Sequence, residues 1–192
     1  TNRSLDKTDT SNTFVQMSLH TQETNNKNRL ITNLGYGYRE LSDDNSFMYG
    51  ANAFIDIESE GHMRASLGLE AKGKILDLNA NLYEAISGKE TVGGVNEEVL
   101  SGYQLNLTTQ IPYMPWSTLN IQNYSFESIK ATNDTEGNKI SLEMNLTPTL
   151  QFDISQDFSD TTGVDDETDF KVTLKYPPSE NKPNLQDGFI LN

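Results

Sequence analysis

Apolar and polar residues alternate along most of the chain, as expected for β-strands that have one apolar and one polar face. The clearest stretch is 63–72, where Met, Ala and Leu residues alternate with Arg, Ser, Gly, Glu and Lys. Comparable stretches lie at 14–20, 30–39, 47–57, 76–82, 103–111, 140–146, 150–155 and 170–176. The segment 116–126 alternates poorly and is assigned as a strand because its neighbours need a partner. The pattern therefore predicts about ten antiparallel strands.

The lengths of these stretches favour a membrane-spanning barrel over a sandwich. Most are longer than the roughly five or six residues of an average soluble strand, and about 9–11 residues suffice to cross a bilayer at a tilt. No run approaches the ~18 apolar residues of a membrane helix. We expect an all-β fold, an antiparallel transmembrane β-barrel with about ten strands in this chain.

The connections fall into short and long ones, apart from those at 22–28 and 59–62, which are intermediate or short. Those at 42–45, 74–75, 112–115 and 147–148 are short, whereas those at 86–98, 128–138 and 159–167 are long. Bacterial barrels have short periplasmic turns and longer extracellular loops, which predicts a periplasmic N-terminus. An aromatic girdle is expected at the periplasmic rim; its members would be Tyr38, Phe47, Tyr49, Tyr113, Trp116 and Tyr176.

Composition narrows the partners. The chain has 28 Asp and Glu residues against 14 Lys and Arg residues, for a net charge of −14. That balance argues against nucleic acid as a partner, because phosphate binding requires a basic surface. Cysteine is absent, which excludes disulfides and thiol-ligated metals.

Three regions follow from these patterns. We expect residues 1–12 to form a polar and loose N-terminal lead, and residues 13–177 to form the barrel. Residues 178–192 form a tail or linker; Pro177, Pro178 and Pro183 suit an extended path.

Several short motifs occur in the order found in a known family. Residues 33–39 read NLGYGYR, residues 49–56 read YGANAFID, and 61–71 contain GH, R and LGLEA. Residues 79–88 contain NANLY and SG, residues 101–115 contain SGYQL and IPYMP, and residues 146–148 read LTP. Together these segments resemble the β-domain of the inverse autotransporters, the intimin and invasin type, over residues 28 to 177.

The resemblance implies an outer-membrane barrel of twelve strands whose chain passes back through the pore and displays an extracellular adhesive passenger. It implies outer-membrane lipid and lipopolysaccharide, the barrel-assembly machinery and the chain's own C-terminal linker or passenger as partners. It implies no cofactor. Two alternatives remain: a structural or pore-type barrel without a passenger, and a soluble all-β interaction protein.

The candidate functional residues are the charged side chains expected on the inner face. These lumen-lining residues are Arg39, Arg64, Glu70, Lys72, Asp77, Glu143, Lys171 and Lys175, with Asp153 beside them. They could grip a threaded linker or filter solutes; alternatively, they only solvate the lumen through ion pairs, which contribute little individually.

Catalytic and metal sites are not expected. His20 and His62 fall near the proposed extracellular rim, but neither a nucleophile motif nor an acidic dyad accompanies them. The acidic stretch 157–169 could bind Ca²⁺, yet its spacing does not match an EF-hand, and a solvated loop is the favoured interpretation.

Overall fold

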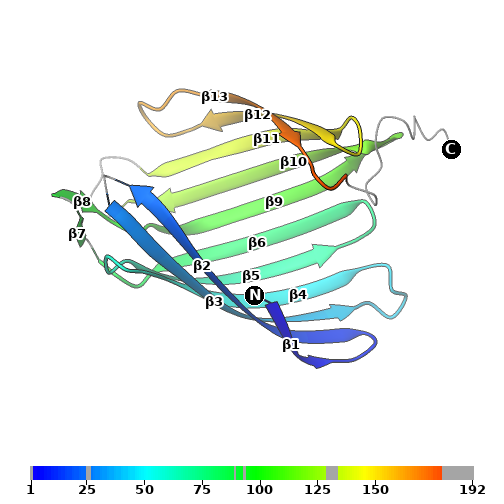
Figure 1. The fold of residues 1–192 in the computed structure, drawn as a ribbon, viewed down its shortest axis with the longest axis horizontal. Helices are drawn as coiled ribbons and strands as arrows, with labels where there is room; N and C mark the ends of the chain where they lie inside the picture. The colour runs from blue at the N-terminus through cyan, green and yellow to red at the C-terminus, as the bar shows by residue number, and fades with distance from the viewer. Residues whose placement is uncertain (1, 25–26, 89, 93, 129–133, 179–192) are drawn as a thin grey trace.

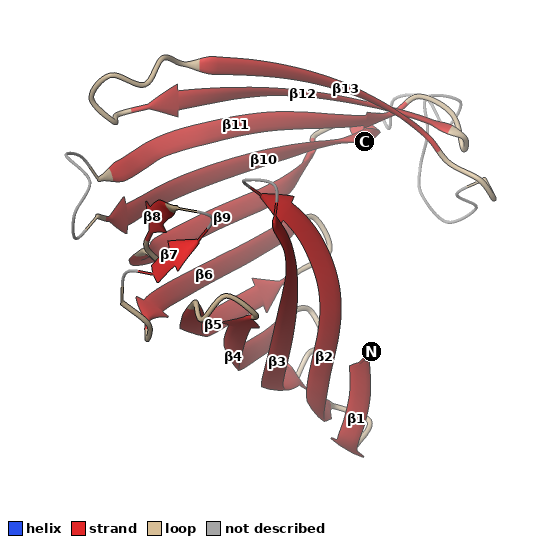
Figure 2. Ribbon diagram, turned by 60° about the vertical axis from the view of Figure 1, so that its left-hand side comes forward, coloured by secondary structure: helices blue, strands red, loops and turns tan. Residues whose placement is uncertain are grey.

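The computed structural model describes residues 2–24, 27–88, 90–92, 94–128 and 134–178. Eleven strands form one strongly curved antiparallel sheet in the order β1-β2-β3-β4-β5-β6-β9-β10-β11-β12-β13, and β7 and β8 pair separately (Figures 1 and 2). The strands are β1 (Asn2–Lys7), β2 (Ser11–Thr24), β3 (Lys27–Leu41), β4 (Met48–Glu58), β5 (Met63–Lys72), β6 (Leu76–Ala85), β7 (Glu90–Val92), β8 (Val95–Glu97), β9 (Ser101–Ile111), β10 (Met114–Glu127), β11 (Thr135–Asn145), β12 (Leu150–Ser159) and β13 (Glu167–Leu174).

Each strand expected from the alternation is present, in chain order and paired with its neighbours. The weakly alternating segment 116–126 lies within β10, which pairs with β9 on one side and β11 on the other. A shift of register between Met114 and Thr118 interrupts the pairing with β9. Backbone pairing on both sides fixes β10 as a strand where the side-chain pattern is ambiguous.

The prediction of a loose N-terminal lead is wrong for Asn2–Lys7. These residues form β1 and pair with β2 from Asn2 opposite Gln16 to Lys7 opposite Asn12. All six residues are exposed, so this strand buries no apolar face and its sequence carries no alternation. Backbone hydrogen bonds to β2 hold it in the sheet, and these leave no trace in the hydrophobic pattern.

The sheet has two distinct ends. The turns at 42–47, 73–75, 112–113 and 146–149 lie at the short-turn end, and the connections at 59–62, 86–88, 98–100 and 160–166 lie at the long-loop end. In Figure 1 the long-loop end, with β7 and β8, lies on the left. Among the described residues, no helix is long and apolar enough to cross a membrane.

The two edges of the sheet do not pair with each other in the described part of the chain: β1 pairs with β2, and β13 with β12. Because successive neighbours are antiparallel and the sheet has eleven strands, β1 and β13 run in the same direction. Direct closure would therefore create a parallel pair. One more strand, antiparallel to both edges, would restore the alternation and give the even number that bacterial barrels have.

Candidate functional site: the polar inner wall

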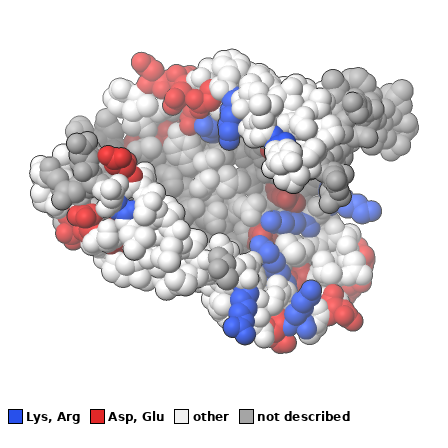
Figure 3. All heavy atoms as spheres, viewed as in Figure 1, with Lys and Arg blue, Asp and Glu red and all other residues white. Residues whose placement is uncertain are grey.

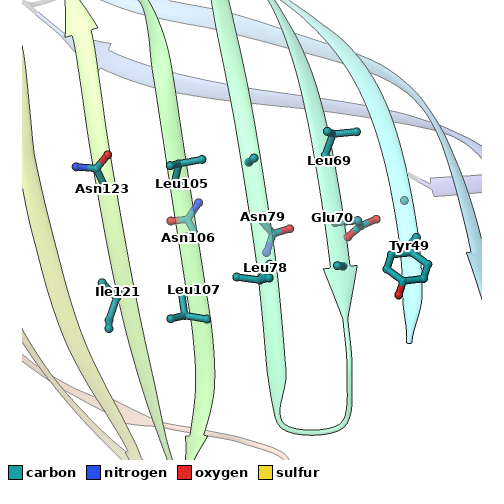
Figure 4. Close-up of a pocket in the computed structure, with 13 residues that line it drawn as sticks. Tyr49, Leu69, Glu70, Leu78, Asn79, Leu105, Asn106, Leu107, Ile121 and Asn123 are labelled. Atoms are coloured by element: carbon teal, nitrogen blue, oxygen red, sulfur yellow. The ribbon is translucent and has the colours of Figure 1, made fainter. Parts of the chain in front are cut away.

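The sheet has an apolar face that is largely exposed. Leu67, Leu69 and Leu82 are 63%, 65% and 62% exposed, and further large apolar side chains line the same face. Figure 4 shows Leu69, Leu78, Leu105, Leu107 and Ile121 along adjacent strands, where they line a shallow groove of about 580 Å³. We call this surface the outer belt. A continuous apolar surface of this kind on a single curved sheet requires an apolar neighbour.

The opposite face is polar, and we call it the inner wall. The sheet curls toward it (Figure 2), so side chains from adjacent strands converge there. Glu70 is 8% exposed although the preceding residue, Leu69, is 65% exposed. Figure 3 shows acidic side chains gathered over the β12–β13 connection, and basic and acidic ones mixed toward the short-turn end of β1–β4.

The first cluster on the inner wall centres on Glu70. Arg39 Nε donates to Glu70 Oε1 at 2.5 Å, and Lys72 Nζ lies 3.3 Å from Glu70 Oε2. Gly50 stands between Arg39 and Glu70 in the register of β3, β4 and β5. Arg39 also lies 4.8 Å from the centre of the Phe14 ring, a cation–π contact. Three of the predicted lumen-lining residues, Arg39, Glu70 and Lys72, are thus brought together.

A second cluster lies closer to the long-loop end. Arg64 Nη2 donates to Asp56 Oδ2 at 3.0 Å, and Asn33 donates its amide to the other oxygen of Asp56. The Arg64 guanidinium sits 4.7 Å from the centre of the Tyr83 ring. Arg64 was predicted on this wall, whereas its partner Asp56, and Asn33 that also bonds Asp56, were not selected as functional residues.

The remaining predicted residues also occupy inner-wall positions but do not join these clusters. Asp77 lies opposite Lys72 in register, and Lys171 lies opposite Asp153. Lys175 donates to Asn145 Oδ1 at 3.0 Å, and the Asn145 amide donates to Glu143 at 3.4 Å. Whether these eight side chains line a closed lumen stays a prediction.

Five of the six residues expected in the aromatic girdle are exposed, and Trp116 is not. Tyr38, Phe47, Tyr49 and Tyr113 are exposed large aromatic side chains, as a rim position requires, and Tyr176 is too. Trp116, in contrast, is only 6% exposed, so assigning it to an exposed rim was wrong. It lies within the irregular stretch of β10 between Met114 and Thr118, where an interrupted register no longer dictates which way a side chain points.

A model of the inverse autotransporter β-domain matches residues 3–185. The chain belongs to this family. The resemblance drawn from the motifs is therefore confirmed, and the family supports an outer-membrane location and an anchoring role for this β-domain.

Two relatives from Escherichia coli (strain K12) are similar to the β-domain. One is a putative attaching and effacing protein homolog, 28% identical over 151 residues, which are 73% of this chain and 50% of the relative. The other is YchO, an uncharacterised protein, 27% identical over 144 residues, which are 71% of this chain and 30% of YchO. The β-domain thus spans half or less of these curated relatives.

A solved structure, titled for a study of in-meso crystallization of membrane proteins, shows the same fold. It superposes with a TM-score of 0.71 at 16% identity, over 91% of this chain and 74% of the other. Because the identity is low, this likeness concerns the fold alone.

The sequence approach missed a third charged cluster of the β-domain, at the long-loop end. Arg29 Nη1 lies 3.1 Å from Glu58 Oε1 and 2.6 Å from Glu97 Oε2, and His62 Nδ1 lies 3.3 Å from Glu58 Oε2. Arg29 is 6% exposed and His62 is 6% exposed. The positions of Arg29 and Glu58 on the inner face could have been found from the alternation, but Glu97 comes from the long connection, which carries no period.

Among the described residues, the histidines and the acidic stretch considered from the sequence form no metal-binding group. His62 pairs with Glu58, and both His20 and His62 line a polar hollow on the inner wall. In the described residues no group of three His, Cys, Asp or Glu side chains could hold a metal ion, and this includes the acidic stretch 157–169.

Proposed function

We propose that this inverse autotransporter β-domain closes into an outer-membrane barrel that anchors, translocates and displays an extracellular passenger used for adhesion. The observation that supports this most directly is the pairing of an exposed apolar outer belt with a polar inner wall. Contact with lipid would keep the apolar outer belt out of water. The polar inner wall would then line a solvated channel. A soluble sheet with the same belt would aggregate, which disfavours the soluble alternative.

Closure of the barrel is part of the proposal. A strand that is antiparallel to both β1 and β13 would complete the circle and give twelve strands, the number that the family resemblance implies. It would also satisfy the two rows of unpaired backbone groups, which are costly inside a bilayer.

Orientation follows from the two ends of the sheet. We place the short-turn end in the periplasm and the long-loop end outside the cell. The turn at 8–10 between β1 and β2 lies at the short-turn end, and from there the chain enters β2. β1 runs from Asn2, opposite Gln16 of β2, to this turn, so Asn2 lies partway along the wall and the periplasmic N-terminus stays a proposal.

The direction of the last strand supports a linker that passes through the lumen. β13 runs toward the short-turn end, where Leu174 pairs with Leu150 beside the turn at 146–149. The linker would begin beyond Tyr176 at this periplasmic end and pass back through the lumen. The predicted linker 178–192 lies outside the described residues apart from Pro178. Lipid, lipopolysaccharide and the barrel-assembly machinery are further partners in this proposal.

The test uses the complete gene product with an epitope tag at the far end of the passenger. We expect a heat-modifiable band from outer-membrane fractions and tag exposure on intact cells. A heat-modifiable barrel whose tag stays inaccessible on intact cells, but is reached after lysis, would contradict display and favour a pore or structural barrel. Recovery of the protein in a soluble, detergent-free fraction would contradict the membrane proposal itself.

A further inference from the structure

The long connection between β6 and β9 does not extend freely from the sheet. It contains the β7–β8 hairpin, and we call the described residues 90–92 and 94–99 the strap. Figure 2 shows β7 and β8 between the ends of β2–β3 and those of β9–β10. Val92 is 1% exposed, so the hairpin packs against the protein rather than extending into solvent.

One end of the strap is fastened to β3 by a bidentate ion pair. Glu97 receives both terminal nitrogens of Arg29, at 2.6 Å and 2.7 Å. The Arg29 side chain is 8% exposed and that of Glu97 is 19% exposed. Bidentate geometry of this kind is the strongest arrangement for such a pair, and Glu58 holds the same guanidinium from β4 at 3.1 Å.

The next residue of the strap is fastened on the other side. Ser128 Oγ, just beyond the end of β10, donates to Glu98 Oε1 at 2.7 Å. In the sheet β3 and β10 are separated by β4, β5, β6 and β9. Adjacent residues Glu97 and Glu98 therefore connect two distant parts of the rim, and the strap crosses the concave side of the sheet at its long-loop end.

A polar hollow of about 540 Å³ lies beneath the strap. Ser18, Asn33 and Arg64 of the inner wall line it, and so does Val99 of the strap. Strands of three residues are too short to be stable alone. The position of the hairpin over this hollow therefore depends on its contacts with the rest of the protein, which include the burial of Val92 and the two fastenings.

We propose that the strap is a gate at the extracellular mouth of the conduit, held across it by Glu97–Arg29 and Glu98–Ser128. This inference rests on the proposed outer-membrane orientation and deepens it. In this proposal the closed strap admits small solutes to the hollow and keeps bulky groups out of it. Removing the charge of Glu97 takes away one of the two carboxylates that pair with Arg29. The attachment of the strap to β3 is thereby weakened.

Cysteine labelling tests the gate, since the chain contains no cysteine of its own. Ser18→Cys places a thiol in the hollow, and Gln22→Cys, an exposed site nearer the tip of β2, serves as a reference. Full-length protein on intact cells is treated with a small maleimide or a bulky poly(ethylene glycol) maleimide. We expect Glu97→Gln to raise the bulky-reagent rate at the Ser18→Cys thiol about tenfold, with the small-reagent rate and the reference rate unchanged.

Glu136→Gln is the matched control, because Glu136 is an exposed carboxylate on the same end of the sheet. Equal bulky-reagent rates in the presence and absence of Glu97→Gln, with normal labelling of the reference, would overturn the gate. If Glu97→Gln loses its heat-modifiable band, Ser128→Ala replaces it and must give the same direction of change. If the Gln22→Cys reference does not react on intact cells, the proposed outer-membrane orientation is wrong. The gate is then tested in purified, detergent-solubilised protein by the same comparison of bulky-reagent rates with and without Glu97→Gln.

Discussion

Arg39 and Glu70 form an ion pair, 2.5 Å between Nε and Oε1, that reaches across β4 over Gly50. The pair can form because Gly50 has no side chain: a Cβ there would lie 2.6 Å from Glu70 Oε1 and 2.7 Å from its Cγ. The shape of the inner wall is thus set by small residues as much as by charged ones.

Alanine at selected glycines should destabilise the sheet, by an amount that depends on which atoms the new Cβ would meet. At Gly102 a Cβ would collide with the Ser125 carbonyl oxygen, and backbone cannot move aside cheaply. Gly102→Ala should therefore cost about 1–3 kcal/mol of unfolding free energy, and Gly50→Ala less, because the Glu70 side chain can shift.

Urea-induced unfolding in detergent, followed by heat-modifiable migration, measures this series. Gly88→Ala is the control, because no atom lies within 4 Å of its added Cβ. A Gly102→Ala variant as stable as the control would contradict the close approach of β9 and β10.

A charged side chain on the outer belt should lower the stability of the protein only if the belt faces lipid. Leu67 is 63% exposed in the middle of β5, so Leu67→Arg would be nearly neutral in water. In a bilayer Leu67→Arg should lower the free energy of unfolding by about 2–4 kcal/mol. Folding titrations in lipid vesicles measure the difference, with Val164→Arg in the β12–β13 connection, 55% exposed, as the control. Equal stabilities for the two variants would count against a lipid-facing belt.

The turn between β3 and β4 contains a carboxyl group whose pKa is set by hydroxyl donors. Hydrogen bonds from Ser42 and Ser46 lower the pKa of Asp44 from its ordinary 3.8 to about 2. Because the folded value is depressed, the stabilisation from Asp44 is present above about pH 4 and is lost as the pH falls toward 2.

Ser42→Ala removes the largest contribution and should raise the Asp44 pKa toward 3.8. An NMR titration of the Asp44 carboxyl carbon in detergent measures it. Thr162→Ala, in the β12–β13 connection, is a distant control that should leave this pKa unchanged. An Asp44 that titrates identically with and without the Ser42 hydroxyl would show that the turn is held in another way.

Closure of the sheet should be visible in amide exchange along β13. In an open sheet only every second amide of Glu167–Leu174 bonds to β12 and exchanges slowly. If a further strand pairs with the free edge, all amides of β13 should be protected. Hydrogen exchange of the full-length protein in lipid discs measures this, with β5, paired on both sides, as an internal reference. Persistent alternation along β13 beside a fully protected β5 would contradict closure.

The sequence by itself determined the strands that carry a two-residue period, the order in which they pair and which face is polar. Arg39, Arg64, Glu70 and Lys72 were placed on one face by counting, because consecutive side chains of a strand point to opposite sides. That rule is local, so it needs no knowledge of distant residues, and the family motifs rest on the same segments.

Only the tertiary structure decided the features that depend on pairing between distant segments. β1 has no apolar period and is a strand because β2 offers it hydrogen-bonding partners. Trp116 is buried because the register of β10 shifts beside it. The Arg29–Glu97 pair joins residues 68 positions apart, and neither local sequence predicts it. The two side chains meet only because the curved sheet brings the strap close to β3.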